Sequence, residues 1–272
     1  AIAEYKRYGD WSRCGFRSAG CGAVHRVLPL MLNLLGRRAP DSDDDWEELQ
    51  RSTWEEIVAA TLLTHDDDVA VACSVAMCGL LWTVLADPVS FAPRDKRRPW
   101  LSTFLSFLGE FPQRQLTARL GSGLRDGLST DGGSGTITLL ETLNDLEEQL
   151  ERGTELNVLL ERYGTGTYLL ELVPSMLATL ECLGDCPLNA IRVSAASWNA
   201  ETQTSLVAMM LAARDGEAVI EADWMERLER QFRPPGRAAA DELTRTITSF
   251  TARLKGAGDM PSSPMEPDGQ DG

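Results

Sequence analysis

The sequence predicts an all-α protein made of many packed helices. Apolar residues recur at spacings of three and four residues in most of the segments between residues 23 and 255, which is the period of an amphipathic helix. Sustained alternation of apolar and polar residues is missing, so strands are not expected. No apolar heptad persists over several turns, which excludes a coiled coil.

The N-terminal third contains three predicted helices, each with a recognisable end. The helix at Ala23–Leu35 stops before Gly36, and Thr53–Leu62 carries its apolar residues on one face. The helix at Asp66–Leu85 has acidic residues in its first turn and Pro88 just beyond its end, which are ordinary start and stop signals. We expect Thr64 or Asp66 to cap this helix.

The rest of the chain continues the helical pattern. Further helices are predicted at Leu139–Leu150, Thr154–Arg162, Tyr168–Leu183, Leu188–Ser197, Thr202–Arg214, Ala222–Gln231 and Ala238–Lys255. Pro174 predicts a kink or a boundary within Tyr168–Leu183. Leu120–Thr138 is rich in Gly, Ser and Asp, which predicts a long loop. Residues 1–255 are therefore expected to form one helical domain, and residues 256–272 a disordered tail that packs against nothing.

Charge and composition exclude several classes of partner. The 272 residues include 26 Lys+Arg and 41 Asp+Glu, so the formal net charge is 26 − 41 = −15. This balance argues against nucleic acid and anionic membranes, because both would be repelled. We expect no membrane-spanning segment, since no uninterrupted apolar run approaches about 20 residues. The six cysteines do not form a zinc motif, and Cys73 and Cys78 are expected to be reduced core thiols in a cytoplasmic protein.

Three short segments are candidates for chemistry, and each has a simpler structural interpretation. The small-residue loop at Gly20–Gly22 precedes a helix and could hold a phosphate, or it is an ordinary tight turn. Thr64–Asp68 could be a metal or ligand site, or only a helix start with favourable acids. The oxygen-bearing side chains of Asn199, Glu201 and Thr202 could bind a hard cation such as Mg²⁺, or Asn199 is simply an N-cap.

The acidic run Asp41–Trp46 is not a calcium loop. An EF-hand needs Gly at its sixth position and Glu at its twelfth, and here those positions hold Trp46 and Ser52. We interpret the run as a solvated acidic entry to the helix that is predicted to begin at Thr53.

The order of these motifs resembles that of the ADP-ribosylglycohydrolase family, the all-α Mg²⁺-dependent hydrolases that include the dinitrogenase-reductase-activating glycohydrolases. The likeness covers about residues 14–232. It depends on four motifs in order: Gly20–Leu30 (GCGAVHRVLPL), Thr64–His65, Arg162–Pro174 (RYGTGTYLLELVP) and Asn199–Gly216 (NAETQTSLVAMMLAARDG), and Asp223–Glu229 resembles the closing helix that follows. The resemblance implies a single orthogonal multi-helix globule.

The resemblance also implies which residues form the site. Gly20, Cys21 and Gly22 would cradle ribose or phosphate with backbone N–H groups, and His65 would hydrogen-bond the ligand. Near the adenine, the implied residues are Tyr163, Gly164 and Tyr168. Asn199, Glu201 and Thr202 would be the metal positions, in a family that uses two Mg²⁺ ions to orient ADP-ribose and a water. The catalytic residue itself is not assigned.

The sequence departs from the family pattern at its metal motifs. Asn199 and Glu201 stand where the family has two aspartates, although Thr202 is retained. The upstream Thr-Asp-Asp motif is not found before Gly20, which leads us to expect an N-terminally truncated piece of a longer protein, and His25 replaces a Met. Two functions follow as expectations: a Mg²⁺-dependent hydrolase that removes ADP-ribose from a modified protein or small acceptor, or an inactive member that binds ADP-ribose or acts as a regulatory module.

Overall fold

The structure is a computed structural model that describes residues 6–7, 9, 14–35, 43–92, 99–109, 139–220, 222–231 and 245. The predictions for Leu120–Thr138, Ala238–Lys255 and residues 256–272 lie outside the described residues, apart from the single position 245. The structural statements that follow concern the described ranges.

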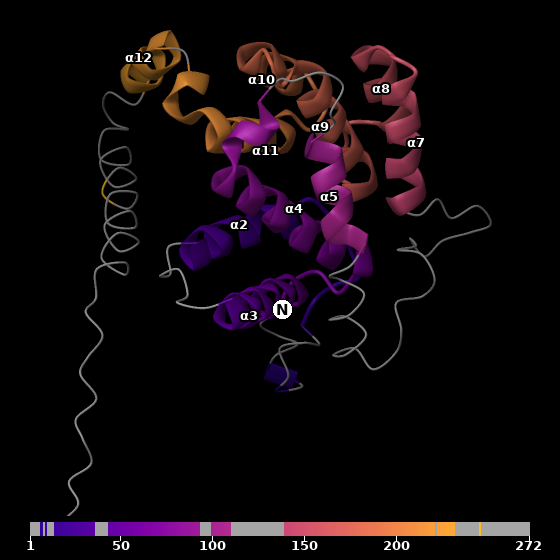
Figure 1. Cartoon of the computed structure of the whole chain (residues 1–272), viewed down its shortest axis with the longest axis vertical. Helices are drawn as coiled ribbons and strands as arrows, with labels where there is room; N and C mark the ends of the chain where they lie inside the picture. The colour runs from indigo at the N-terminus through magenta and orange to yellow at the C-terminus, as the bar shows by residue number, and fades with distance from the viewer. Residues whose placement is uncertain are drawn as a thin grey trace, which may run out of the picture.

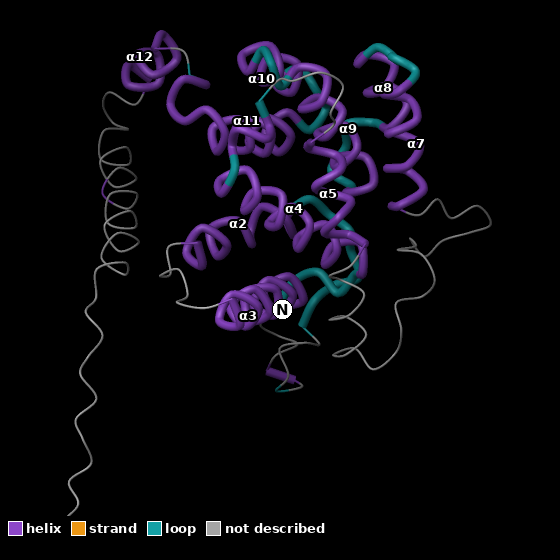
Figure 2. Tube along the Cα trace, in the orientation of Figure 1, coloured by secondary structure: helices purple, strands orange, loops and turns teal. Residues whose placement is uncertain are grey.

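The described chain is helical, as predicted (Figures 1 and 2). Its α-helices are α2 (Gly22–Leu35), α3 (Asp43–Leu62), α4 (Asp68–Ala86), α5 (Pro99–Gly109), α7 (Leu139–Glu151), α8 (Leu156–Tyr163), α9 (Leu169–Leu183), α10 (Pro187–Ala195), α11 (Ala200–Asp215) and α12 (Ala222–Gln231). Short 3-10 helices occupy Pro88–Phe91 and Gly216–Val219. In these ranges the β-type pairing consists of two isolated bridges.

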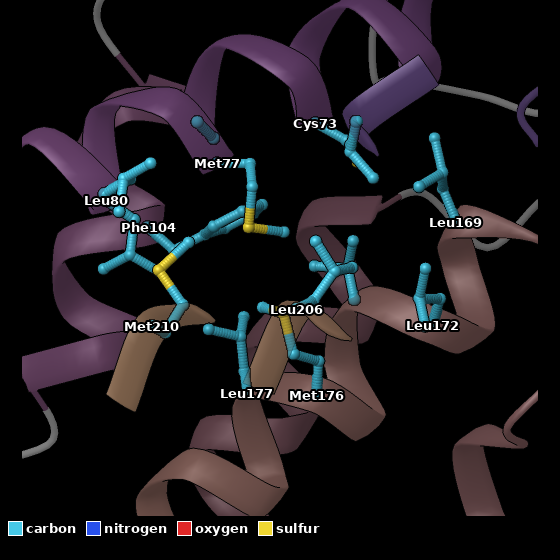
Figure 3. Packing of buried hydrophobic residues seen from close by; sticks show 14 of the residues in the cluster. Cys73, Met77, Leu80, Phe104, Leu169, Leu172, Met176, Leu177, Leu206 and Met210 are labelled. Atoms are coloured by element: carbon cyan, nitrogen blue, oxygen red, sulfur yellow. The ribbon is translucent and has the colours of Figure 1, made fainter. Parts of the chain in front are cut away.

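Helix α4 is the centre of the fold. Its residues from Val69 to Leu81 are all buried, and it contacts α2, α3, α5, α9 and α11. Figure 3 shows side chains of α4 (Cys73, Met77, Leu80) facing those of α5, α9 and α11 (Phe104, Leu169, Leu172, Met176, Leu177, Leu206, Met210). The prediction that Cys73 and Cys78 are core thiols is confirmed, because both are fully buried and unpaired.

Helix α4 corrects the expectation that no uninterrupted apolar run approaches about 20 residues. It is 19 residues long with a mean hydropathy of 2.2, so by length and composition it could cross a membrane. Most of it is buried inside this fold, as in the core helix of a globular protein. An all-round apolar helix is what a central position in a multi-helix core requires.

The cap of α4 is Asp67, not Thr64 or Asp66 as predicted. The Asp67 carboxylate accepts hydrogen bonds from the backbone N–H groups of Val69 (2.9 Å) and Ala70 (3.2 Å). Thr64 and Asp66 have other partners: the Thr64 hydroxyl bonds to His65, and the Asp66 backbone N–H donates to Phe16. A tertiary contact therefore moved the start of the helix.

Helices α3 and α5 also differ from the predictions. Helix α3 begins at Asp43 rather than Thr53, so Asp43–Trp46 forms its first turn instead of preceding it. Acidic residues are favourable at that end of a helix because of its macrodipole. Helix α5 was not predicted. Two Phe, two Ser, one Thr and one Trp in its sequence PWLSTFLSFLG have only modest helix preferences, and burial of Trp100, Leu101, Phe104 and Leu108 on one face stabilises it.

Pro174 does not interrupt α9, so of the predicted kink or boundary the boundary is wrong. The helix runs continuously from Leu169 to Leu183 with Pro174 buried inside it. The proline cannot donate a backbone hydrogen bond. In the turn around it, the Ser175 hydroxyl donates to the carbonyl of Glu171 (2.7 Å) and lies within hydrogen-bond distance of Leu172 O (3.1 Å).

Candidate functional site

The segment before α2 connects the starts of two other helices. Phe16 and His65 form a parallel bridge, with Phe16 N donating to Thr64 O (3.0 Å) and Asp66 N donating to Phe16 O (2.8 Å). Gly20 forms an antiparallel bridge with Tyr168. One extended segment therefore holds the N-terminal ends of α4 and α9 beside its own entry into α2.

The loop between α8 and α9 connects the start of α2 to the start of α11. From one side, Cys21 N donates to Thr167 O (2.9 Å). From the other side, Asn199 N donates to Thr165 O (3.0 Å) and the Asn199 amide Nδ2 donates to Gly166 O (3.2 Å). The starts of α2, α9 and α11 are thus joined around residues 164–168, and the start of α4 is linked to them through Phe16, although these segments are far apart in the sequence.

Glu171 explains why this loop contains two glycines. Its carboxylate accepts a hydrogen bond from Gly166 N (3.0 Å). A Cβ at Gly166 would lie 2.2 Å from Glu171 Oε2, and a Cβ at Gly164 would lie 3.1 Å from the same atom. Gly164 also has a φ of 82°, in the left-handed region that favours glycine. The loop therefore closes around a carboxylate.

His65 lies against the Gly20–Gly22 loop. Its Nδ1 is 2.7 Å from Thr64 Oγ1, and its Nε2 is 3.7 Å from the point that a Cβ on either Gly20 or Gly22 would occupy. Burial lowers the pKa of His65, the positive charge of Arg26 lowers it further, and Asp67 opposes the shift. The imidazole is therefore neutral near pH 7, and its Nε2 is on the loop side.

The start of α11 also contacts the start of α2 through side chains. Cys21 Sγ lies 3.7 Å from Thr202 Oγ1, and one turn farther along both helices His25 Nε2 lies 2.8 Å from Ser205 Oγ. The structure thus brings together seven of the residues named from the sequence: Gly20, Cys21, Gly22, His65, Tyr168, Asn199 and Thr202. Their roles in ligand binding stay predictions.

Of the residues predicted near the adenine, Tyr163 lies in a separate cluster of side chains. The Tyr163 hydroxyl donates to Asp145 Oδ2 (2.6 Å), and Arg162 makes a two-pronged salt bridge to the same carboxylate (2.7 and 2.8 Å). This cluster joins α8 to α7. Burial and the Asp145 carboxylate raise the pKa of Tyr163. Gly164 belongs to the loop through Glu171, whereas the Tyr163 hydroxyl is engaged away from it.

The predicted metal residues do not fit a two-ion centre. Glu201 is exposed and is the single carboxylate among the three. Asn199 is neutral, and it does not cap its helix because its amide binds Gly166 O instead. Across the described ranges, no group of three or more His, Cys, Asp or Glu side chains is placed to hold a metal ion. One negative charge is too little for two divalent cations, which proteins bind mostly through carboxylates.

Sequence reasoning left out two residues that the structure places at the site. Glu171 organises the loop and occurs in the quoted motif, but its role depends on a fold-back of the chain. Ser205 lies three residues after Thr202 on α11, and that helical spacing is a signal that could have found it.

Comparison with known proteins identifies a family. A family model described as ADP-ribosylglycohydrolase matches residues 1–257 of the 272. Proteins of this family are generally metal-dependent and act on ADP-ribosylated substrates. No curated protein matches the chain.

Proposed function

The chain belongs to the ADP-ribosylglycohydrolase family, and from this premise we propose that it removes ADP-ribose from a modified protein or small acceptor by hydrolysis. In this reaction water breaks the bond between the ribose C1″ and the acceptor. The net charge of −15 favours a protein or small-molecule partner over nucleic acid or membrane, and we expect the protein to act in the cytoplasm.

The observation that carries this proposal is the meeting of helix starts around residues 164–168. The N-terminal end of a helix has unpaired N–H groups and partial positive charge, which suit an anionic pyrophosphate. In the described ranges the starts of α2, α9 and α11 share backbone hydrogen bonds through this loop, and α4 joins through Phe16. A diphosphate in this position would lie between the starts of α2, α9 and α11.

Named side chains would complete the binding of ADP-ribose. His65 is neutral, with Nδ1 hydrogen-bonded to Thr64, so Nε2 remains to bond a ribose hydroxyl or phosphate oxygen. The glycines at positions 20 and 22 keep the backbone close to this atom. Tyr168, half-buried where it pairs with Gly20, would line the nucleoside side. No step is assigned to magnesium, because the donors do not fit the two-ion centre.

A second function is favoured by one specific observation. Asn199 uses its amide to hold Gly166, leaving Glu201 as the only carboxylate in the predicted metal set. This arrangement supports an ADP-ribose-binding or regulatory module that binds the ligand at this site without efficient hydrolysis.

Calorimetric titration with ADP-ribose, run beside a release assay on ADP-ribosylated arginine and serine peptides with Mg²⁺, tests both functions. We expect binding by the unmodified chain, weaker binding by His65→Ala, and unchanged binding by Val158→Ala, which removes an exposed apolar side chain on α8. Binding with release supports the hydrolase, and binding without release supports the module. If ADP-ribose does not bind, both are wrong.

A further inference from the structure

A serine and a histidine face each other across α2 and α11, one turn beyond the contact between Cys21 and Thr202. His25 Nε2 lies 2.8 Å from Ser205 Oγ. This distance is within the range over which a base can take a proton from a hydroxyl nucleophile. The function proposed above uses neither side chain.

The state of His25 suits a proton acceptor. Burial lowers the pKa of its imidazole, and a hydrogen bond to the Cys21 backbone opposes that shift without cancelling it. The ring is therefore neutral near pH 7, which is the state in which an imidazole can accept a proton. A neutral imidazole that donates to the backbone through one nitrogen has the other nitrogen free to accept.

The serine is reachable from solvent while the base is partly shielded. Ser205 is exposed and His25 is half-buried. The Ser205 hydroxyl also lies 2.9 Å from the carbonyl oxygen of Thr202, so its single proton has two acceptors within range. When the Ser205 hydroxyl rotates so that its proton points to His25 Nε2, the lone pairs of Ser205 Oγ are available to an approaching electrophile.

We propose that Ser205 and His25 form a nucleophile–base pair that hydrolyses small carboxylic esters. Ser205 Oγ attacks the ester carbonyl carbon as its proton moves to His25 Nε2. The carbon–oxygen bond to the alcohol then breaks, and the alcohol leaves with that proton. Water attacks the acyl-serine, gives a proton to His25, and releases the carboxylic acid as the proton returns to Oγ. This activity does not depend on ADP-ribose removal.

The first experiment uses a fluorophosphonate, which reacts with activated serines. The bond from Oγ to phosphorus forms, the phosphorus–fluorine bond breaks, and the serine proton passes to His25 as fluoride leaves. Ser106 is the matched control: it is exposed and also donates to the carbonyl three residues earlier (2.7 Å), while the two histidines of the chain bond to Ser205 and Thr64. Peptide mass spectrometry measures the labelling rate at each site.

We expect Ser205 to be labelled at least about 100-fold faster than Ser106, which is the low end of the acceleration that a positioned base supplies. His25→Gln should remove most of this difference while the circular dichroism spectrum stays helical. Hydrolysis of 4-nitrophenyl acetate should fall in Ser205→Ala and in His25→Gln. Equal labelling of the two serines, no labelling of Ser205, or labelling that is unchanged in His25→Gln would overturn the proposal, and the pair would then be only a link between α2 and α11.

Discussion

The hydrogen bond between Gly166 and Glu171 organises the loop at the site, and substituting Gly166 tests this. In Gly166→Ala the new Cβ would lie 2.2 Å from Glu171 Oε2, so the carboxylate must rotate away. The rotation is sterically easy, but it breaks the 3.0 Å hydrogen bond from the backbone N–H of residue 166. A hydrogen bond to a charged group contributes about 1.5–3 kcal/mol. We expect the free energy of unfolding to fall by that amount.

Urea unfolding at 25 °C measures the change, and a double-mutant cycle isolates its cause. In Glu171→Ala the carboxylate is absent, so adding Gly166→Ala should cost almost nothing. A second control is Gly22→Ala, whose Cβ would make only ordinary contacts of 3.5–3.7 Å with His65. If Gly166→Ala destabilises the protein equally with and without the Glu171 carboxylate, the hydrogen bond is not the cause and the reasoning fails.

Three further predictions concern packing, protonation and metal binding. Gly79→Ala should lower the free energy of unfolding by about 1–3 kcal/mol through overpacking, because its Cβ would lie 2.4 Å from Phe107 Cγ; an unchanged urea midpoint would contradict this. The pKa values of His25 and His65 are both lowered by burial, so the unfolded chain binds more protons than the folded protein as the pH falls below the ordinary value of 6.5. The free energy of unfolding should therefore be greatest above that pH and fall between about pH 7 and pH 5, the range in which histidines titrate. In the double variant His25→Gln/His65→Gln, urea unfolding curves should show that this free energy depends less steeply on pH. Asn199→Asp adds a second carboxylate beside Glu201. Because affinity follows the number of charged ligands, calorimetry should show that this variant binds Mn²⁺ or Mg²⁺ about tenfold more tightly than the unmodified chain does. Equal affinity in Asn199→Asp and Glu201→Gln would show that these residues do not bind the metal.

Periodicity in the sequence was enough to predict the all-α class and most of the helices. Helix α12 begins and ends at the predicted residues, and α7 and α9 differ by one residue at a single end. These segments contain their own apolar stripe, and α9 has its own stop signal in Gly184. The order of short motifs was also enough to predict the family, which the match over residues 1–257 confirms.

Only the tertiary structure determined the roles of particular polar side chains. Asn199 has the sequence signal of an N-cap, yet its amide binds Gly166, which is 33 positions earlier. Asp67 caps α4 because Asp66 is paired with Phe16, and α5 forms because Trp100 and Phe104 find a buried surface. A hydroxyl, amide or carboxylate can satisfy several alternative partners of similar energy. Long-range packing decides which partner is within reach, and no local pattern of residues contains that information.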